Sequence, residues 1–177
     1  MESVTDEISA GEIFAELYEQ YLPKVFRYIQ YRVNSMQLTE DLTSTTFEKA
    51  LVNFSRYSSD KAKFSTWIFS IARNVVIDHY RVSQRKQTAP LEEAGEVSSK
   101  DLSPEEKLFQ GEELERLQIY LAQLQQDEQE IIHLKFVAEL NNRQIAKMLG
   151  LSESNVGTRL YRAVRKLRDS FQESENG

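Results

Sequence analysis

The side chains best suited to contact another molecule lie on the helix that the sequence predicts after residue 152. Hydroxyl, aromatic and guanidinium groups recur there every three or four residues, at Ser154, Thr158, Tyr161 and Arg165, with Arg162 beside them. That spacing places them on one face of a helix. Such groups suit base edges and phosphates in the major groove of DNA. We therefore expect this face to contact duplex DNA.

Three further cations on the same helix, Arg159, Lys166 and Arg168, flank this face. We expect them to meet mainly backbone phosphates, a contact that positions a protein on DNA without specifying the sequence. The N-terminus of the helix adds N–H donors and a dipole that favours phosphate.

Two helices and a tight turn are predicted to position these groups. Asn141 and Gln144 have the spacing that caps a short first helix, and Ser152 can cap the second. Gly150, between them, allows the positive φ that a sharp turn needs.

The spacing of small and apolar residues favours a helix-turn-helix over an ordinary corner between two helices. Ala146, Gly150 and Val156 lie where that motif needs a small contact residue, a turn glycine and an interhelical apolar residue. Gly157 is the exception, because a glycine inside a helix costs about 1 kcal/mol relative to alanine. The buried stripe of the second helix is predicted to be Val156, Leu160, Val164 and Leu167.

The first half of the chain is predicted to form long helices, since residues 24–89 contain neither glycine nor proline. Ser9, with a glutamate three residues later, has capping-box spacing for a first helix that Pro23 breaks or kinks. Thr39 can cap a second helix. Apolar residues at helical spacing predict a third from residue 64 to about residue 82.

Residues 85–103 change character and are predicted to be a flexible, acidic linker, with serine, glycine and proline but no aromatic residue. Ser103, followed by proline and two glutamates, then fits the start of a helix. Further helices are predicted over about 104–121 and 128–137. Since no segment sustains β-alternation, the sequence predicts an all-α fold with two small helical domains, 1–84 and 104–177, the second containing the helix-turn-helix.

The formal net charge of −6 hides an alternation of charged blocks. Residues 61–86 and 141–168 carry net charges of +5 and +6, while 1–20 and 91–117 carry −6 each. A polyanion responds to the local field, so the basic blocks suit nucleic acid. A solvated helix face is the alternative for either block alone.

The composition excludes several classes of protein. Cysteine is absent, so there is neither a disulfide framework nor a thiolate metal site. We find no signal peptide and no apolar run that approaches 18 residues, and expect a cytoplasmic location without direct membrane insertion. His79 and His133 stand alone, and the sequence has no glycine-rich phosphate loop. We therefore expect no enzyme activity, small-molecule substrate, metal or cofactor.

Two segments carry a resemblance to a known family, EDLTSTTFEKAL and FSTWIFSIARNVVIDHYR. Followed by the linker and the helix-turn-helix, they resemble bacterial RNA polymerase sigma factors of the sigma-70 family. More narrowly, the chain is similar to the extracytoplasmic-function (ECF) group, which has only conserved regions 2 and 4. The resemblance covers about residues 10–170. It implies that 1–84 form region 2 and 104–177 form region 4.

For region 2, the resemblance implies docking on the β′ coiled coil of core RNA polymerase through Asp41 and Glu48. Leu42 and Phe47 of the same helix are expected in the core. Ser44 and Thr45 depart from the family, which often has glutamine and an acid there.

The resemblance also implies that region 2 binds the promoter −10 element. In the family, the connector before the third helix captures a base flipped out of the non-template strand. Extruding the base costs a few kcal/mol, which stacking or hydrogen bonding in a pocket repays. The connector residues expected to do so are Ser58, Ser59, Asp60 and Lys61. Asn74, Asp78 and Arg81 share a helix face that is expected to meet the −10 strand. Trp67 is expected mainly in the core.

For region 4, the resemblance implies −35 recognition and contact of the upstream helices with the polymerase β flap. The matching base readers are Gly157, Thr158, Tyr161 and Arg162, and Lys135 matches a phosphate-contacting position. Gly157 departs from the family, in which a long basic residue is common. Members are often inhibited by an anti-sigma factor, which is a further expected partner.

Two other classes of function stay open at this point. A conventional helix-turn-helix regulator binds duplex DNA alone, usually as a dimer on paired half-sites. A helical adaptor would use its basic stripes to bind another acidic protein. Core-polymerase binding and promoter-specific transcription distinguish the sigma factor from both.

Overall fold

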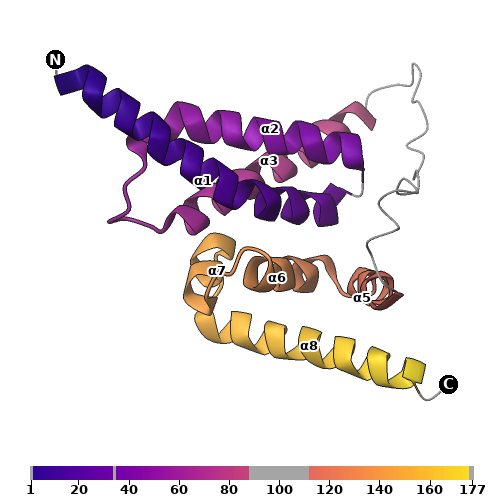
Figure 1. Cartoon of the computed structure of the whole chain (residues 1–177). Helices are drawn as coiled ribbons and strands as arrows, with labels where there is room; N and C mark the ends of the chain where they lie inside the picture. Colours follow the sequence, from indigo (N-terminus) through magenta and orange to yellow (C-terminus); the bar gives the residue numbers. More distant parts are fainter. Residues whose placement is uncertain (1, 34, 88–111, 176–177) are drawn as a thin grey trace. The chain divides into compact units, whose positions relative to one another are not determined.

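The structure, a computed structural model, describes residues 2–33, 35–87 and 112–175 (Figure 1). Side chains are described for 10–33, 35–85 and 116–173. The chain divides into two compact units, Met1–Lys100 and Asp101–Gly177. Within the described residues every regular element is helical, which confirms the predicted all-α class. None of the described helices is long and apolar enough to cross a membrane.

Unit 1 is built from three helices that pack on one another, α1 (Glu2–Val33), α2 (Met36–Asn53) and α3 (Phe64–Gln87) (Figure 1). A short 3-10 helix, η1 (Phe54–Arg56), follows α2. The rings of Tyr28 and Phe69 meet edge to face at 5.4 Å in the centre. The side chains that are wholly buried in unit 1 are Val25, Tyr28, Ile29, Thr39, Thr46, Ala50, Ile68, Phe69, Ala72 and Val76.

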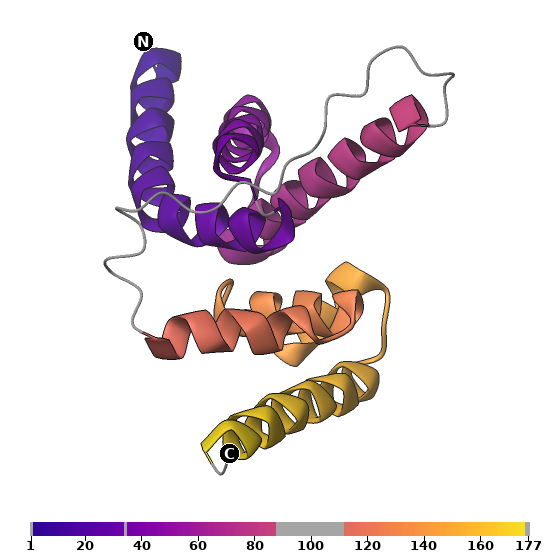
Figure 2. The same ribbon diagram turned by 90° about the vertical axis from the view of Figure 1, so that its right-hand side faces the viewer.

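Helix α1 differs from its prediction at its start, whereas at Pro23, for which a break or a kink was predicted, the helix continues and is bent (Figure 2). It begins at Glu2, so Ser9 lies inside the helix rather than at its N-cap. Pro23 lies within a continuous helix, and Figure 2 shows that the helix is bent along its length. Proline removes one intrahelical hydrogen bond and pushes the preceding turn aside, which bends a helix without always ending it.

Helix α2 begins one turn earlier than expected. Ser35 is its N-cap, and the Ser35 Oγ accepts from the Leu38 N–H. Thr39 is instead buried, and its hydroxyl donates to the Ser35 carbonyl at 2.7 Å. Helix α3 starts at Phe64 as predicted but continues to Gln87, beyond the expected end near residue 82. The rest of the predicted linker, and the helix start at Ser103, lie outside the described residues.

Unit 2 contains α5 (Glu112–Ala122), α6 (Gln126–Phe136), α7 (Asn142–Leu149) and α8 (Glu153–Glu175), with α8 packed against the other three. Ala163 is wholly buried on α8, whereas the neighbouring Val164 is 44% exposed. The predicted stripe was therefore wrong at Val164, because the small residue sits where helices approach closely. One cluster of this core comprises Leu121, Leu124, Ile132 and Ala163, with the partly buried Leu117, Leu160 and Leu167 packed against it.

The predicted helix-turn-helix signals are confirmed in full. Asn141 Oδ1 accepts from the Gln144 N–H at 2.9 Å, and Gln144 Oε1 accepts from the Asn141 N–H at 2.8 Å. Gly150 ends α7 with φ of 68°, in the left-handed region. Ser152 Oγ accepts from the Asn155 N–H at 3.1 Å. These local bonds fix where α7 stops and α8 starts.

Candidate nucleic-acid interface

The outer face of α8 presents the polar groups that the sequence predicted. Ser154, Thr158, Arg162 and Arg165 are exposed, and the Tyr161 side chain is 68% exposed. Thr158 Oγ1 donates to the Ser154 carbonyl at 3.0 Å, which fixes its rotamer. Tyrosine and arginine are among the side chains that most often contribute strongly to a binding interface.

Arg159 and Lys166 lie on another side of α8 and form ion pairs with the start of α6. Arg159 pairs with Asp127, and its Nε also donates to Asn155 Oδ1 at 2.7 Å. Lys166 Nζ donates to both carboxylate oxygens of Glu128, at 2.8 Å each. Both cations therefore connect α8 to α6. Arg168, which was also expected on phosphate, pairs with the adjacent Asp169.

Glu128 is a buried carboxylate with several partners. Burial by itself raises the pKa of Glu128, but the Lys166 hydrogen bonds, the Gln125 N–H and the charges of Lys166 and Arg159 together hold that pKa below its ordinary value. The Gln125 bond is part of the α6 capping box, at 3.2 Å. Glu128 therefore stays ionised while it joins the start of α6 to α8.

Lys135, Asn142 and Gly157 come together from three helices. Lys135 Nζ, on α6, donates to Asn142 Oδ1, on α7, at 3.2 Å. A Cβ placed on Gly157, in α8, would lie 3.7 Å from Asn142 Nδ2. The space beside the glycine is thus shared with the asparagine carboxamide.

In unit 1, the connector between η1 and α3 turns back on itself. The Ser58 carbonyl accepts from the N–H groups of Lys61 and Ala62, at 3.1 and 3.3 Å. Ser59, Asp60 and Lys61 are exposed and Ser58 is half-buried, so the four predicted residues form one polar turn.

Aromatic packing holds this turn at both ends. The rings of Tyr57 and Trp67 lie 5.0 Å apart, and Phe54 and Phe64 pack against both. Trp67 therefore packs in the cluster, as expected. Burial, and then the neighbouring Tyr21, raise the pKa of Tyr57. Its hydroxyl stays neutral at physiological pH.

The outer face of α3 carries Asn74, Asp78 and Arg81, all exposed. Arg81 Nη1 lies 3.6 Å from Asp78 Oδ1, one turn away. Tyr80 donates its hydroxyl hydrogen to the Arg32 carbonyl at 2.5 Å, which ties α3 to the end of α1. The three polar groups are thus held on a braced helix.

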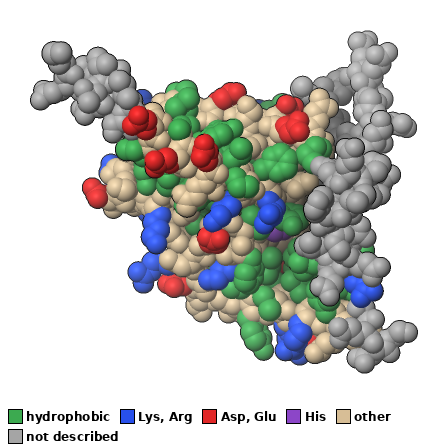
Figure 3. Space-filling model, viewed as in Figure 1, with side chains coloured by type: hydrophobic (Ala, Val, Ile, Leu, Met, Phe, Trp, Pro, Cys, Tyr) green, Lys and Arg blue, Asp and Glu red, His purple; other side chains and the backbone are tan. Residues whose placement is uncertain are grey.

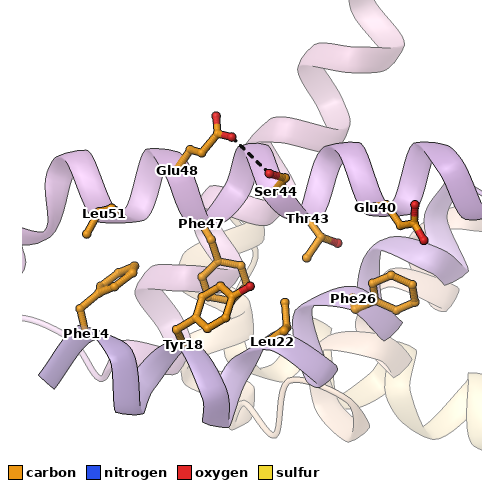
Figure 4. A pocket seen from close by; sticks show the side chains of 10 residues that line it. All are labelled: Phe14, Tyr18, Leu22, Phe26, Glu40, Thr43, Ser44, Phe47, Glu48 and Leu51. Carbon is orange, nitrogen blue, oxygen red and sulfur yellow. Dashed lines mark hydrogen bonds between the residues drawn. The ribbon is translucent and has the colours of Figure 1, made fainter. Parts of the chain in front are cut away.

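Helix α2 has an acidic outer side and a buried inner side. Leu42 and Phe47 are buried as expected, while Asp41 and Glu48 are exposed. Ser44 Oγ donates to Glu48 Oε1 at 3.2 Å (Figure 4). In Figure 3, acidic side chains lie beside apolar ones over α1 and α2.

A groove of about 400 Å³ runs between α1 and α2 (Figure 4). Its walls are aromatic and aliphatic, and Glu40, Ser44 and Glu48 add polar groups. Thr43 also lines it, and within the described residues the buried Thr43 hydroxyl has no hydrogen-bond partner. The apolar lining consists of Phe14, Tyr18, Leu22, Phe26, Phe47 and Leu51.

Comparison with protein families gives two matches in the order predicted. Residues 17–86 match sigma-70 region 2, and residues 114–167 match sigma-70 region 4. The chain belongs to the sigma-70 family. Region 2 corresponds to α1–α3 and region 4 to α5–α8, so the polar connector and the recognition helix fall in different sigma regions.

Curated relatives are ECF sigma factors. The chain is 33% identical over 169 residues to the ECF RNA polymerase sigma factor BldN of Streptomyces coelicolor, covering 94% of this chain and 64% of BldN. It is 27% identical over 161 residues to the ECF sigma factor SigM of Bacillus subtilis, covering 91% of this chain and 96% of SigM.

Solved structures of sigma factors share the fold. The sigma factor RpoE in complex with the anti-sigma factor NepR, from Bartonella quintana, matches with a TM-score of 0.72 and 19% identity, covering 91% of this chain and 98% of RpoE. CnrH in complex with the cytosolic domain of CnrY matches with a TM-score of 0.66 and 21% identity, covering 92% and 90%.

Sequence reasoning missed some members of the sigma region 4 site. Asp127 and Asn142 were not singled out, although Asn142 follows the predicted cap Asn141 and Asp127 precedes Glu128, the expected start of a helix. Glu128 was noticed only as a helix start. Nothing local in the sequence distinguishes an acid that caps a helix from one that also pairs with a lysine 38 residues later.

Proposed function

We propose that this sigma factor binds core RNA polymerase and directs promoter-specific initiation by reading the −10 element with region 2 and the −35 element with region 4. The observation that carries the proposal is the presence of both sigma regions in one chain, each with an exposed polar face on a braced helix. The proposal needs no enzyme activity, cofactor or small-molecule substrate.

The −35 element is read by α8 in this proposal. Tyr161 and Thr158 are supported as base contacts by their exposure on one face. Arg162, Arg165 and Lys135 supply positive charge that phosphates and base acceptors attract. Ser154, near the start of α8, adds a hydroxyl at the same edge.

The −10 element is bound by the connector and by α3. The turn at Ser58–Lys61 offers hydroxyl, carboxylate and ammonium groups of a size that suits one extruded base. The aromatic cluster behind the turn keeps it in place without ligand, so little ordering cost falls on binding. Asn74, Asp78 and Arg81 extend the contact along α3.

Core polymerase docks on α2 through Asp41 and Glu48, with the β′ coiled coil as the counterpart. The exposure of both acids supports this assignment, since a basic partner gains on-rate and orientation from them. Region 4 contacts the β flap with its upstream helices. Ser44 differs from the residue that is common in the family, but its hydrogen bond to Glu48 keeps it compatible with an acidic docking face.

An anti-sigma factor is a further partner in this proposal. The similar structure of RpoE was solved in complex with the anti-sigma factor NepR. The apolar α1–α2 groove next to the docking acids suits apolar side chains of a partner segment, with the Thr43 hydroxyl as a polar contact. Because the polymerase is cytoplasmic, the cytoplasm is the proposed place of action.

Transcription by core polymerase with this protein, on a fragmented genomic library with mapped start sites, tests the proposal. We expect start sites that share a −10 and a −35 sequence and that disappear when the protein is omitted. Tight binding of the isolated protein to a palindrome as a dimer, with no promoter activity gained by core polymerase, would instead establish the conventional regulator.

A further inference from the structure

We propose that Asn142, on the first helix of the helix-turn-helix, contacts promoter DNA through its Nδ2 group beside Gly157. This inference rests on the −35 recognition proposed above and adds a residue to it. The side chain absent at position 157 is replaced, in this view, by one reaching over from α7.

The geometry that carries the inference is the meeting of three helices. Asn142 Nδ2 lies 3.7 Å from where a Cβ of Gly157 would be. Gly157 precedes Thr158 and lies one turn before Tyr161, both on the exposed face of α8. The carboxamide therefore lies at the edge of the face that reads DNA.

Lys135 determines which end of the carboxamide is presented. Its ammonium donates to Asn142 Oδ1 at 3.2 Å, so the oxygen is directed to α6 and the Nδ2 hydrogens to the glycine side. The Lys135 ammonium has three hydrogens and gives one of them to this bond. The Lys135–Asn142 pair is therefore mainly a hydrogen-bond donor.

Donors of this kind match acceptors on DNA. Purine N7, guanine O6 and thymine O4 are acceptors in the major groove, and phosphate oxygens are acceptors on the backbone. The positive charge of Lys135 next to the amide favours these electron-rich DNA acceptors, on either the bases or the backbone. The shared chemistry is an amide N–H bonded to a DNA oxygen or nitrogen.

Gly157 matters because a larger side chain has to share this space. A Cβ alone makes ordinary van der Waals contact with the carboxamide at 3.7 Å, so alanine fits. A long basic side chain at 157 has to continue past the carboxamide and moves it from the α8 edge. Gly157→Ala and Gly157→Arg thus form a matched pair, of which only the second displaces Asn142.

The test uses the full chain reconstituted with core polymerase, and duplexes with a randomised −35 element. For Asn142→Ala we expect about 3- to 10-fold weaker promoter binding, the effect of one lost hydrogen bond. A base-edge contact also flattens the preference at one position, whereas a phosphate contact weakens all sequences alike and, because the carboxamide is uncharged, leaves the salt dependence unchanged.

A second variant separates DNA contact from a structural role. Asn142→Asp keeps the side-chain shape and strengthens the bond with Lys135, but it offers an acceptor where DNA also offers one. We expect Asn142→Asp to bind more weakly than Asn142→Ala while its thermal unfolding matches or exceeds wild type. A merely structural Asn142 ties the loss of binding to the loss of stability, so Asn142→Ala would then bind as wild type at a temperature at which both proteins are fully folded.

Two controls distinguish failure of this inference from failure of −35 recognition. If Thr158→Ala and Tyr161→Ala lose affinity while Asn142→Ala binds as wild type, Asn142 is not a DNA contact. If none of the three changes −35 binding, the recognition face itself is wrong. The claim that Gly157→Arg displaces Asn142 is tested with the double variant. Adding Asn142→Ala to Gly157→Arg should not change DNA affinity further, and additive losses of affinity would overturn this claim.

Discussion

Lys166 on α8 donates to both carboxylate oxygens of Glu128 on α6, at 2.8 Å each, and joins the recognition helix to the start of another helix. The Glu128 side chain is only 9% exposed, while Lys166 is 54% exposed. Removing Lys166 should therefore cost more stability than removing the charge of Glu128. An unpaired Lys166 can turn to water, but an unpaired Glu128 stays buried with its charge.

The first prediction concerns this asymmetry. Lys166→Met should lower the free energy of unfolding of the chain more than Glu128→Gln does, because the first leaves a buried carboxylate uncompensated. For Glu128→Gln we expect the free energy of unfolding to fall by about 1–2 kcal/mol, the loss of one charge-assisted interaction. The loss stays this small because the amide oxygen of the new glutamine can still accept from the Gln125 N–H. Chemical denaturation of both variants measures the difference. Equal losses would show that Glu128 is already solvated.

The pH dependence of stability follows from the same pair. The pKa of Glu128 is lowered in the folded chain from an ordinary value of 4.5. A carboxyl of this kind contributes stability above its unfolded pKa and loses it as the pH falls through its folded pKa. We expect the melting temperatures of wild type and Glu128→Gln to differ at neutral pH and to converge below pH 4.5. A gap that stays constant into acid would contradict the assignment.

Arg159 gives a prediction that separates a brace from a phosphate contact. Its pairing with Asp127 and Asn155 supports a role in holding α8 on α6. We expect Arg159→Gln to weaken −35 binding without changing its salt dependence, and Asp127→Asn to have the same effect. Arg162→Gln, the control on the exposed face, should reduce the salt slope by about 1. A reduced salt slope for Arg159→Gln would instead show that Arg159 contacts phosphate.

The features that could be predicted from the sequence are those that depend on residues adjacent in the chain. The reciprocal cap of Asn141 and Gln144, the left-handed Gly150 and the start of α3 at Phe64 each follow from a few adjacent side chains. The pairing of Arg159 with Asp127 joins residues 32 apart and follows from how helices pack, which no local pattern encodes. Thr39 was mistaken for a cap for a related reason, since its burial is decided by tertiary contacts.

Tyr80 provides a test of the brace behind the −10 face. Its hydroxyl donates to the Arg32 carbonyl at the end of α1, where helix carbonyls lack intrahelical partners. Tyr80→Phe removes one hydrogen bond and keeps the ring, so we expect unit 1 to lose about 1 kcal/mol of stability. Hydrogen exchange of the last turn of α1 should rise in the same variant. Unchanged exchange there would mean that solvent replaces the hydroxyl without loss.

Polymerase docking is tested by reversing charge on α2. Asp41 and Glu48 are exposed, so Asp41→Lys and Glu48→Lys should leave thermal unfolding nearly unchanged while weakening the complex with core polymerase. Ser44→Ala removes only the bond to Glu48 and should have a much smaller effect. Glu173→Lys, an equal charge change at an exposed position of α8, is the matched control. Competition for core polymerase measures all four, and equal losses for Glu48→Lys and Glu173→Lys would show that net charge, rather than the α2 face, governs docking.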